Sequence, residues 1–237
     1  MLTNDDVSFY REQGYVLVPN LVDAKLIDRA RAVLQDLLNN AKNVAQSDDV
    51  YDLEPSHSSE NPKVRRIKHP HLVDSVFMEL ARAPAMLGAL QQLLGPTVRL
   101  HGSKINIKPP RVGSAVEWHQ DWAAYPHTND DILAVGVMLD DCLEENGPLL
   151  VVPGSHRGPV LDHHHEGSFI GAIAPDNPEI GYERAVALTG SAGAMSFHHV
   201  RLTHGSANNT SERFRSLLLY EFAAADAWPL SGVKDYE

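Results

Sequence analysis

The stretch Ile132-Leu133-Ala134-Val135-Gly136-Val137-Met138-Leu139 is apolar and rich in valine and isoleucine, as is typical of a β-strand. It belongs to a series of strand-like segments that begins after Thr97. The others are Val98–Ile107, Ala115–Trp118, Leu149–Val152, Ala194–Phe197 and Arg215–Ala223. Turn sequences separate them: Pro109-Pro110, Asn146-Gly147-Pro148, Pro153-Gly154-Ser155 and Asn208-Asn209. Many short strands joined by such turns favour a jelly roll or a small barrel.

The first part of the chain has a different character, because helical signals dominate it. Thr3 and Asp6 form a capping-box pattern before a short helix that Gly14 ends, and the strand Tyr15–Val18 follows. Asp23 is placed to cap a long amphipathic helix. Two further helices are predicted, over Leu72–Ala81 and Pro84–Leu94. We therefore expect a mainly β protein with flanking helices (α+β), in which the helices pack on one outer face. The expected single domain spans 1–237, with a helix-rich flank over 1–95 and a jelly-roll core over 96–226.

Composition excludes several classes of protein. The chain has 237 residues, and 31 acidic against 20 basic side chains give a net charge of −11. That charge disfavours a general nucleic-acid binder or a binder of anionic membranes. Cys142 is the single cysteine, so neither an intrachain disulfide nor a cysteine-rich zinc site is possible, which fits the cytoplasm. The apolar runs are too short to span a membrane, and the first residues lack the features of a secretory signal.

Histidine is unusually frequent, with 13 residues, and this directs attention to metal ligands. His119-Gln120-Asp121 directly follows a predicted strand. Residues i and i+2 of a strand point to the same face, so the imidazole and the carboxylate are aimed at one point. A single His-x-Asp pair also fits a surface ion pair or a hydrogen-bonded core histidine. A metal site needs a third ligand, and His204 is the candidate.

Two histidines and one carboxylate form the facial triad of non-haem Fe(II) oxygenases, which leaves positions open for 2-oxoglutarate and O₂. Such an enzyme also needs a cation for the distal carboxylate of 2-oxoglutarate. Arg215 follows His204 after eleven residues, at the start of a strand-like segment. The planar guanidinium binds a carboxylate through two hydrogen bonds, so arginine suits this role.

Three segments together resemble the phytanoyl-CoA dioxygenase family: His119-Gln120-Asp121, the run from Glu145 to His156, and His204-Gly205-Ser206-Ala207-Asn208-Asn209-Thr210 with Arg215. The resemblance covers nearly the whole chain. It implies a double-stranded β-helix, which is a cupin-like jelly roll, and an enzyme that uses Fe(II), 2-oxoglutarate and O₂.

Position by position, the resemblance places His119, Asp121 and His204 on iron and Arg215 on the co-substrate carboxylate. It also places Ser206 and Lys104 in the co-substrate pocket. Val137 departs from the pattern, because some relatives have a pocket tryptophan at the aligned position.

Other histidines compete with this assignment. His198 and His199 are adjacent in a predicted strand, so at most one faces inward, and we expect His199 to support the site or the core rather than bind metal. The tract His163-His164-His165 is expected to form an exposed loop, or else the rim of the pocket. His156 is expected to support a turn.

The resulting hypothesis is a hydroxylase that oxidises a C–H bond of a small or medium organic metabolite and releases succinate and CO₂. One alternative is a metal-dependent lyase, isomerase or hydrolase on the same barrel, which would not need Arg215. Another is a non-catalytic metal-binding module, which would not need the complete ligand set.

The substrate leaves weaker traces in the sequence. The segment Gln46–Pro62 is polar and lacks periodicity, so we expect a mobile loop that closes over the site as a lid. The basic run Val64–Lys68 fits either a solvated surface or an anion contact at the pocket mouth. Because the net charge is negative, an anionic substrate needs a local cationic contact, for which the candidates are Arg65, Arg66, Lys104, Lys108 and Arg111.

Overall fold

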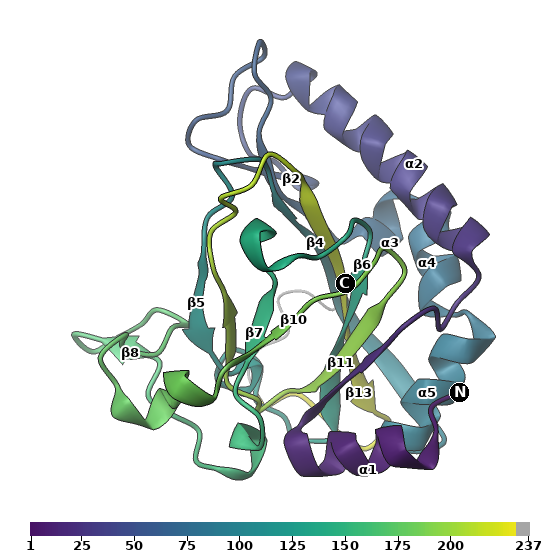
Figure 1. Ribbon diagram of the computed structural model, residues 1–237, viewed down its shortest axis with the longest axis vertical. Coiled ribbons are helices and arrows are strands. Elements are labelled where there is room, and N and C mark those ends of the chain that lie inside the picture. Colours follow the sequence, from purple (N-terminus) through teal and green to yellow (C-terminus); the bar gives the residue numbers. More distant parts are fainter. Residues whose placement is uncertain (231–237) are drawn as a thin grey trace.

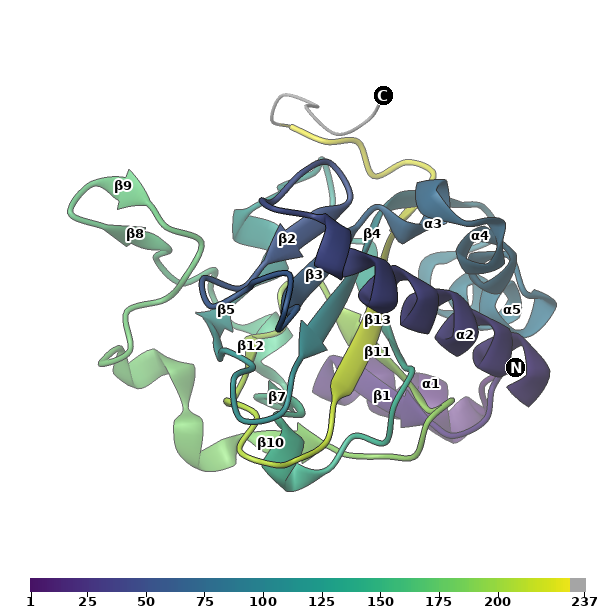
Figure 2. The same cartoon turned by 90° about the horizontal axis from the view of Figure 1, so that it is seen from above.

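The computed structural model describes residues 1–230 and shows two antiparallel β-sheets with helices on the outer face of the larger one (Figure 1). The larger sheet has seven strands in the order β1-β11-β6-β13-β4-β3-β2, and the smaller has four in the order β10-β7-β12-β5. A separate hairpin, β8-β9, projects from the side away from the helices (Figure 2). The two sheets form a double-stranded β-helix, so the expected fold class is confirmed.

The strands that were predicted lie within a few residues of the expected bounds. The strands of the larger sheet are β1 (Tyr15–Val18), β2 (Tyr51–Leu53), β3 (Val64–Lys68), β4 (Val98–Lys108), β6 (Ile132–Met138), β11 (Met195–His199) and β13 (Arg215–Ala224). Those of the smaller sheet are β5 (Val116–His119), β7 (Leu149–Val151), β10 (Val186–Leu188) and β12 (His204–Ser206), and the hairpin comprises β8 (His164–His165) and β9 (Ser168–Phe169).

Five α-helices and six short 3₁₀ helices are found among the described residues. The α-helices are α1 (Asn4–Gln13), α2 (Ala24–Asn40), α3 (Pro70–Val73), α4 (Ser75–Ala81) and α5 (Pro84–Leu94). The 3₁₀ helices are η1 (Ala41–Asn43), η2 (Asp121–Ala123), η3 (Glu144–Asn146), η4 (Ser155–Arg157), η5 (Pro178–Ile180) and η6 (Tyr182–Arg184). The predicted capping box of Thr3 and Asp6 is present at α1, which ends at Gly14 in the left-handed conformation. No helix of the described residues is both long enough and apolar enough to cross a lipid bilayer.

Residues 1–95 contribute three strands to the larger sheet as well as the helices. β3 pairs with β4, and β2 pairs with β3 at the sheet edge. The expectation of a structureless loop over Gln46–Pro62 is therefore wrong for β2. Tyr51 is buried there and its hydroxyl donates to the carbonyl of Leu37 in α2, which fixes the strand against the helix. A three-residue strand is too short for its alternation to be recognised in the sequence.

Alternation along β4 and β13 separates the hydrophobic core from the interior of the barrel. On β13, Leu218, Tyr220 and Phe222 face the helices and belong to the main core. The Tyr220 hydroxyl donates to the carbonyl of Phe77 in α4 at 2.5 Å, which ties the sheet to the helix layer. The intervening side chains of both strands, among them Lys108 and Arg215, line a cavity between the two sheets.

The helix layer should contribute much of the stability of this sheet. Leu80 in α4 is fully buried in the main core, so Leu80→Ala should lower the free energy of unfolding by about 2–5 kcal/mol. Leu72→Ala is the matched control, because Leu72 in α3 is 70% exposed and its loss should change stability by less than about 0.5 kcal/mol. Urea denaturation of the two variants measures both values, and equal losses would contradict the described packing.

Candidate active site

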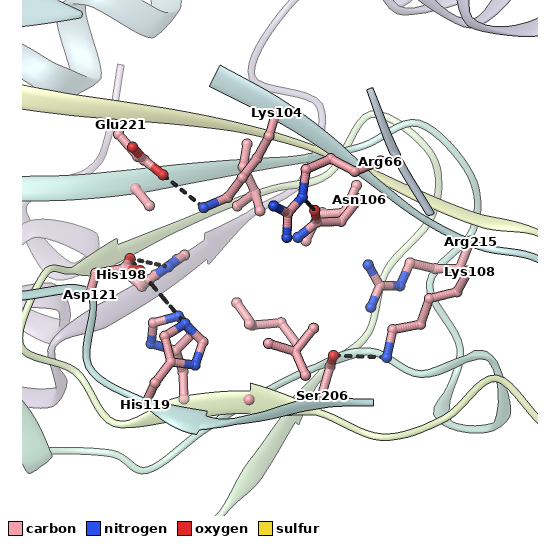
Figure 3. A pocket seen from close by; sticks show the side chains of 17 residues that line it. Arg66, Lys104, Asn106, Lys108, His119, Asp121, His198, Ser206, Arg215 and Glu221 are labelled. Atoms are coloured by element: carbon pink, nitrogen blue, oxygen red, sulfur yellow. Dashed lines mark hydrogen bonds and ion pairs between the residues drawn. The ribbon is translucent and has the colours of Figure 1, made fainter. Parts of the chain in front are cut away.

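The interior of the barrel holds a cavity of about 110 Å³ between the two sheets. Figure 3 shows Arg215 and Lys108 at one end and His119, Asp121 and His198 at the other. Arg66, Lys104 and Asn106 lie between these ends, on the wall opposite Ser206. The structure thus brings every residue of the predicted site to one cavity.

His119, Asp121 and His204 converge at one end of this cavity. Their potential ligand atoms all lie within 4.8 Å of one another. Asp121 Oδ1 is 3.6 Å from His119 Nε2, and Asp121 Oδ2 is 3.9 Å from His204 Nε2. His119 ends β5 and lies opposite His204 of β12 in the antiparallel register, whereas Asp121 begins η2 rather than continuing the strand. Two imidazoles and one carboxylate on one side of a cavity are a donor set that suits Fe(II).

Backbone carbonyls orient both imidazoles. His119 Nδ1 donates to the carbonyl of Glu117 at 2.8 Å, and His204 Nδ1 donates to that of Leu202 at 2.8 Å. A carbonyl only accepts hydrogen bonds, so each neutral ring keeps its proton on Nδ1 and presents the lone pair of Nε2 to the site. The residues therefore fit a metal ion.

The charges at this end also fit a cation. Burial and the neighbouring His119 hold the pKa of His204 well below its usual range, so the ring is neutral. Burial by itself would raise the pKa of Asp121, but its contact with His119 and the charge of Lys104 hold it well below its usual value. A neutral imidazole and an ionised carboxylate are the protonation states that metal binding requires.

His198, and not His199, is the histidine of β11 that faces the cavity. His198 Nε2 lies 3.8 Å from Asp121 Oδ2, and burial lowers its pKa to about 4. His199 points away, toward the rings of Tyr10 and His156, as expected for a residue outside the metal site.

The predicted exposure of the His163–His165 tract is correct for His164 and His165 but wrong for His163, which is buried. His163 Nε2 accepts a hydrogen bond from the backbone N–H of Gln120, the residue between the two ligands of the His-x-Asp motif.

Arg215 is buried at the other end of the cavity without a carboxylate partner. Its guanidinium donates two hydrogen bonds to the carbonyl oxygen of Gly147, and the one from Nε is 2.9 Å long. Gly147 adopts φ +79°, and a Cβ there would lie 2.6 Å from the carbonyl oxygen of Ala207, so the turn requires glycine. Among the described residues, no carboxylate lies within ion-pair distance of Arg215. Burial lowers the pKa of Arg215, as expected for a cation without an anion beside it.

Lys108 lies beside Arg215 and was not among the predicted co-substrate ligands. The two residues are directly opposite each other in the register of β4 and β13. Lys108 Nζ donates to Ser206 Oγ at 2.8 Å and to the carbonyl of Ala207. Burial and the adjacent Arg215 lower the pKa of Lys108 to about 7, against opposing effects of Cys142, Glu117 and Glu54. The signal for Lys108 was its spacing: Lys104, Asn106 and Lys108 alternate along one strand and share its inner face.

Lys104 lines the cavity but already has a partner. Its Nζ lies 2.9 Å from Glu221 Oε1, and this carboxylate raises the pKa of Lys104. Its predicted contact with the co-substrate therefore competes with an existing ion pair.

Val137 is buried on the helix side of β6, so it does not line the cavity, whereas Ala134 of the same strand does.

The remaining candidate cations differ in their surroundings. Arg65 is exposed, whereas Arg66 lines the cavity. Arg111 is exposed and pairs with Glu212 outside the cavity. Within the basic run Val64–Lys68, Arg66 is thus the residue that lines the cavity.

Comparison with known proteins identifies the class of this site. The model of the phytanoyl-CoA dioxygenase family matches residues 10–217. A probable alpha-ketoglutarate-dependent hypophosphite dioxygenase of Stutzerimonas stutzeri is 39% identical over 231 residues, which cover 96% of this chain and 80% of that protein. An L-proline trans-4-hydroxylase of Streptomyces griseoviridis is 34% identical over 194 residues, 72% of this chain and 71% of that protein.

Solved structures show the same fold. The crystal structure of EctD from S. alaskensis with 2-oxoglutarate and 5-hydroxyectoine has a TM-score of 0.80 at 24% identity, covering 100% of this chain and 82% of that chain. The site and the fold thus define a jelly-roll oxygenase with a two-histidine, one-carboxylate centre. The chain belongs to the phytanoyl-CoA dioxygenase family and is a dioxygenase that depends on Fe(II), 2-oxoglutarate and O₂.

The metal-ligand assignment remains a prediction that binding measurements can test. His119→Ala, Asp121→Ala and His204→Ala should each weaken Mn(II) binding by more than the roughly 10–100-fold that loss of a supporting residue causes. His199→Ala is the matched control and should bind Mn(II) like the parent, because its ring lies outside the cavity. Anaerobic calorimetric titration gives the affinities. Parent-like binding by His204→Ala together with loss in His199→Ala would show that the third ligand is misassigned.

Proposed function

We propose that this protein hydroxylates a C–H bond of a small organic molecule, with Fe(II) held by His119, Asp121 and His204. The observation that carries this proposal is the pairing, in one cavity, of the three converging ligands with the buried, unpaired Arg215. When bound, the iron would activate O₂, so that 2-oxoglutarate is oxidised to succinate and CO₂ while the substrate gains a hydroxyl group.

The protein's own residues would position the co-substrate. Arg215 and Lys108 lie side by side with Ser206 at the end of the cavity away from the metal ligands (Figure 3). We assign the distal carboxylate of 2-oxoglutarate to this group, because its negative charge would stabilise the charged forms of both residues. The fork of Arg215 would fix its direction. The predicted role of Ser206 fits this arrangement, whereas Lys104 lies nearer the metal end and is paired with Glu221.

The walls of the cavity would exclude water and limit substrate size. Leu149, Leu217 and Leu219 line it between the polar ends. The volume of about 110 Å³ is well below the roughly 300–1,000 Å³ of pockets for drug-sized ligands. Hypophosphite and proline, which the names of two relatives give as substrates, are both small. These observations support a small substrate over a nucleic acid or a bulky acyl-CoA, and the single cysteine supports a cytoplasmic location.

The alternative of a lyase, isomerase or hydrolase would leave Arg215 without a purpose. A buried guanidinium without a carboxylate is costly, and a reaction with no second anion would not offset that cost. The proposed reaction is tested by succinate release from 2-oxoglutarate over a panel of small substrates. Stimulation of succinate release by at least one of them, with formation of its hydroxylated product, is expected. Conversion of a substrate without consumption of 2-oxoglutarate would contradict the proposal.

The clamp on 2-oxoglutarate should depend on the shape of Arg215 as well as its charge. Arg215→Lys keeps the charge but loses the fork, so the KM for 2-oxoglutarate should rise about 10–100-fold, equivalent to about 1.5–3 kcal/mol. Mn(II) affinity should hardly change, which separates the clamp from the metal site. An unchanged KM in both Arg215→Lys and Arg215→Ala would place the clamp elsewhere.

Lys108 provides a second measurement, because its pKa is about 7 in the free protein. At about pH 8 most of the Lys108 amines are neutral, and an adjacent carboxylate should raise the pKa and draw in a proton. Binding of 2-oxoglutarate to the Mn(II) protein at that pH should therefore take up close to one proton. Calorimetry in two buffers with different ionisation enthalpies measures this uptake. It should vanish in Lys108→Met and persist in Lys104→Met, because Glu221 already keeps Lys104 charged; persistence in Lys108→Met would assign the proton elsewhere.

A further inference from the structure

Arg66 is a cavity cation that belongs neither to the co-substrate clamp nor to an ion pair. It comes from β3, whereas Lys108 and Arg215 come from β4 and β13. Figure 3 shows its guanidinium between the metal end and the Arg215 end, beside Asn106. Its neighbour Arg65 is exposed to solvent.

The contact with Asn106 orients Arg66 toward the cavity. The two residues are directly opposite in the register of β3 and β4, and Arg66 Nε donates to Asn106 Oδ1 at 3.0 Å. This hydrogen bond uses one of the five N–H groups of the guanidinium and fixes its plane. The terminal nitrogens form no ion pair, because no acidic group of residues 1–230 lies within 4.0 Å of them.

Charges around the cavity compensate Arg66 only in part. Among the described lining residues the only carboxylates are Asp121, which faces the histidine ligands, and Glu221, which pairs with Lys104. Burial lowers the pKa of Arg66. Asp52, which lies opposite Arg66 in the register of β2 and β3, and Glu221 offset this effect only in part, and neither carboxylate lies within ion-pair distance of Arg66. A half-buried guanidinium without an ion-pair partner would be stabilised by an anion that a ligand supplies.

We propose that Arg66, oriented by Asn106, binds an anionic group of the substrate, either a carboxylate or a phosphorus oxyanion. This inference rests on the proposed function, because it assumes that 2-oxoglutarate occupies Arg215 and Lys108. The substrate is then a small anion or zwitterion whose oxidised bond lies between Arg66 and the metal ligands. A forked guanidinium beside an amide suits two oxygen atoms on one carbon or phosphorus atom.

The test measures anion binding without turnover. The protein is loaded with Mn(II) and saturating 2-oxoglutarate under anaerobic conditions, so that the Arg215 end is filled. Sodium hypophosphite and sodium acetate are then titrated separately at constant ionic strength, with acetamide as the uncharged counterpart of acetate. At least one anion should bind and acetamide should not, and the preferred anion distinguishes an oxyanion of phosphorus from a carboxylate.

The variants separate Arg66 from its neighbours. In Arg66→Gln the Kd of the preferred anion should rise at least about tenfold, the effect of losing a hydrogen bond between charged groups. Arg65→Gln, on the exposed side of the same strand, should change it less than about twofold. Thermal unfolding verifies that each variant is folded. Arg66→Lys, which keeps the charge and loses the fork, gives an intermediate Kd and replaces Arg66→Gln if that variant does not fold.

Three outcomes would overturn the inference. The first is that neither anion binds to the loaded parent protein, and the second is that the Kd is unchanged in the Arg66 variants. The third is that Arg66→Gln weakens the binding of 2-oxoglutarate as much as it weakens the binding of the probe anion, which would place Arg66 in the co-substrate site. Because Mn(II) supports binding without turnover, none of these results depends on succinate release, which tests the proposed function separately.

Discussion

His204 lies opposite His119 because β12 and β5 pair as antiparallel strands, and the geometry of the whole site depends on this pairing. It brings together two residues that are far apart in the chain, and the ring centroids end 4.1 Å apart. Asp121 completes the group because the chain turns into η2 directly after β5. Its carboxylate thereby lies within 3.9 Å of Nε2 of both imidazoles instead of following the strand. The smaller sheet thus supplies the two histidines, and the turn that directly follows β5 supplies the carboxylate.

The larger sheet supplies the charges that surround them. Alternation along β4 places lysine, asparagine and lysine on the inner face while isoleucines face the helices. β13 repeats the arrangement with Arg215 and Glu221 at opposite ends of its inner face and leucines between them. Since β4 and β13 are adjacent, Lys108 meets Arg215 at one end of the cavity. At the other end Lys104 pairs with Glu221 near Asp121. Strand pairing therefore produces a cavity with a metal end and an anion end.

The sequence predicted those parts of the fold and site that have strong local signals. The long strands, the helix Pro84–Leu94 and the capping box follow from periodicity and caps, and the structure brings His119, Asp121 and His204 together as the His-x-Asp motif and the distant histidine suggested. β3 could not be recognised, because three of its five residues are basic and its strand conformation comes from pairing with β4. Tertiary pairing likewise decided that His198 rather than His199 faces inward. Lys108 was identified as a cation, but its place beside Arg215 depends on the register of two strands more than a hundred residues apart.

The four cavity cations differ in the direction in which their surroundings shift their pKa values, and this difference relates the structure to anion binding. Lys104, which has a carboxylate partner, has a raised pKa, whereas Arg66, Lys108 and Arg215 have lowered pKa values because burial disfavours their charge. In the free protein these three residues are therefore a cost to stability that bound anions would offset. Lys108 and Arg215 lie on central strands and are only 3% exposed, so a ligand there is enclosed by the paired sheet. Arg66 lies on β3, one strand from the sheet edge, and is more accessible. Binding of an anion at Arg215 thus depends on central strands that the fold itself requires. The contact at Arg66 can change without disturbing these strands. This difference fits a family whose relatives carry names as different as hypophosphite dioxygenase and proline hydroxylase.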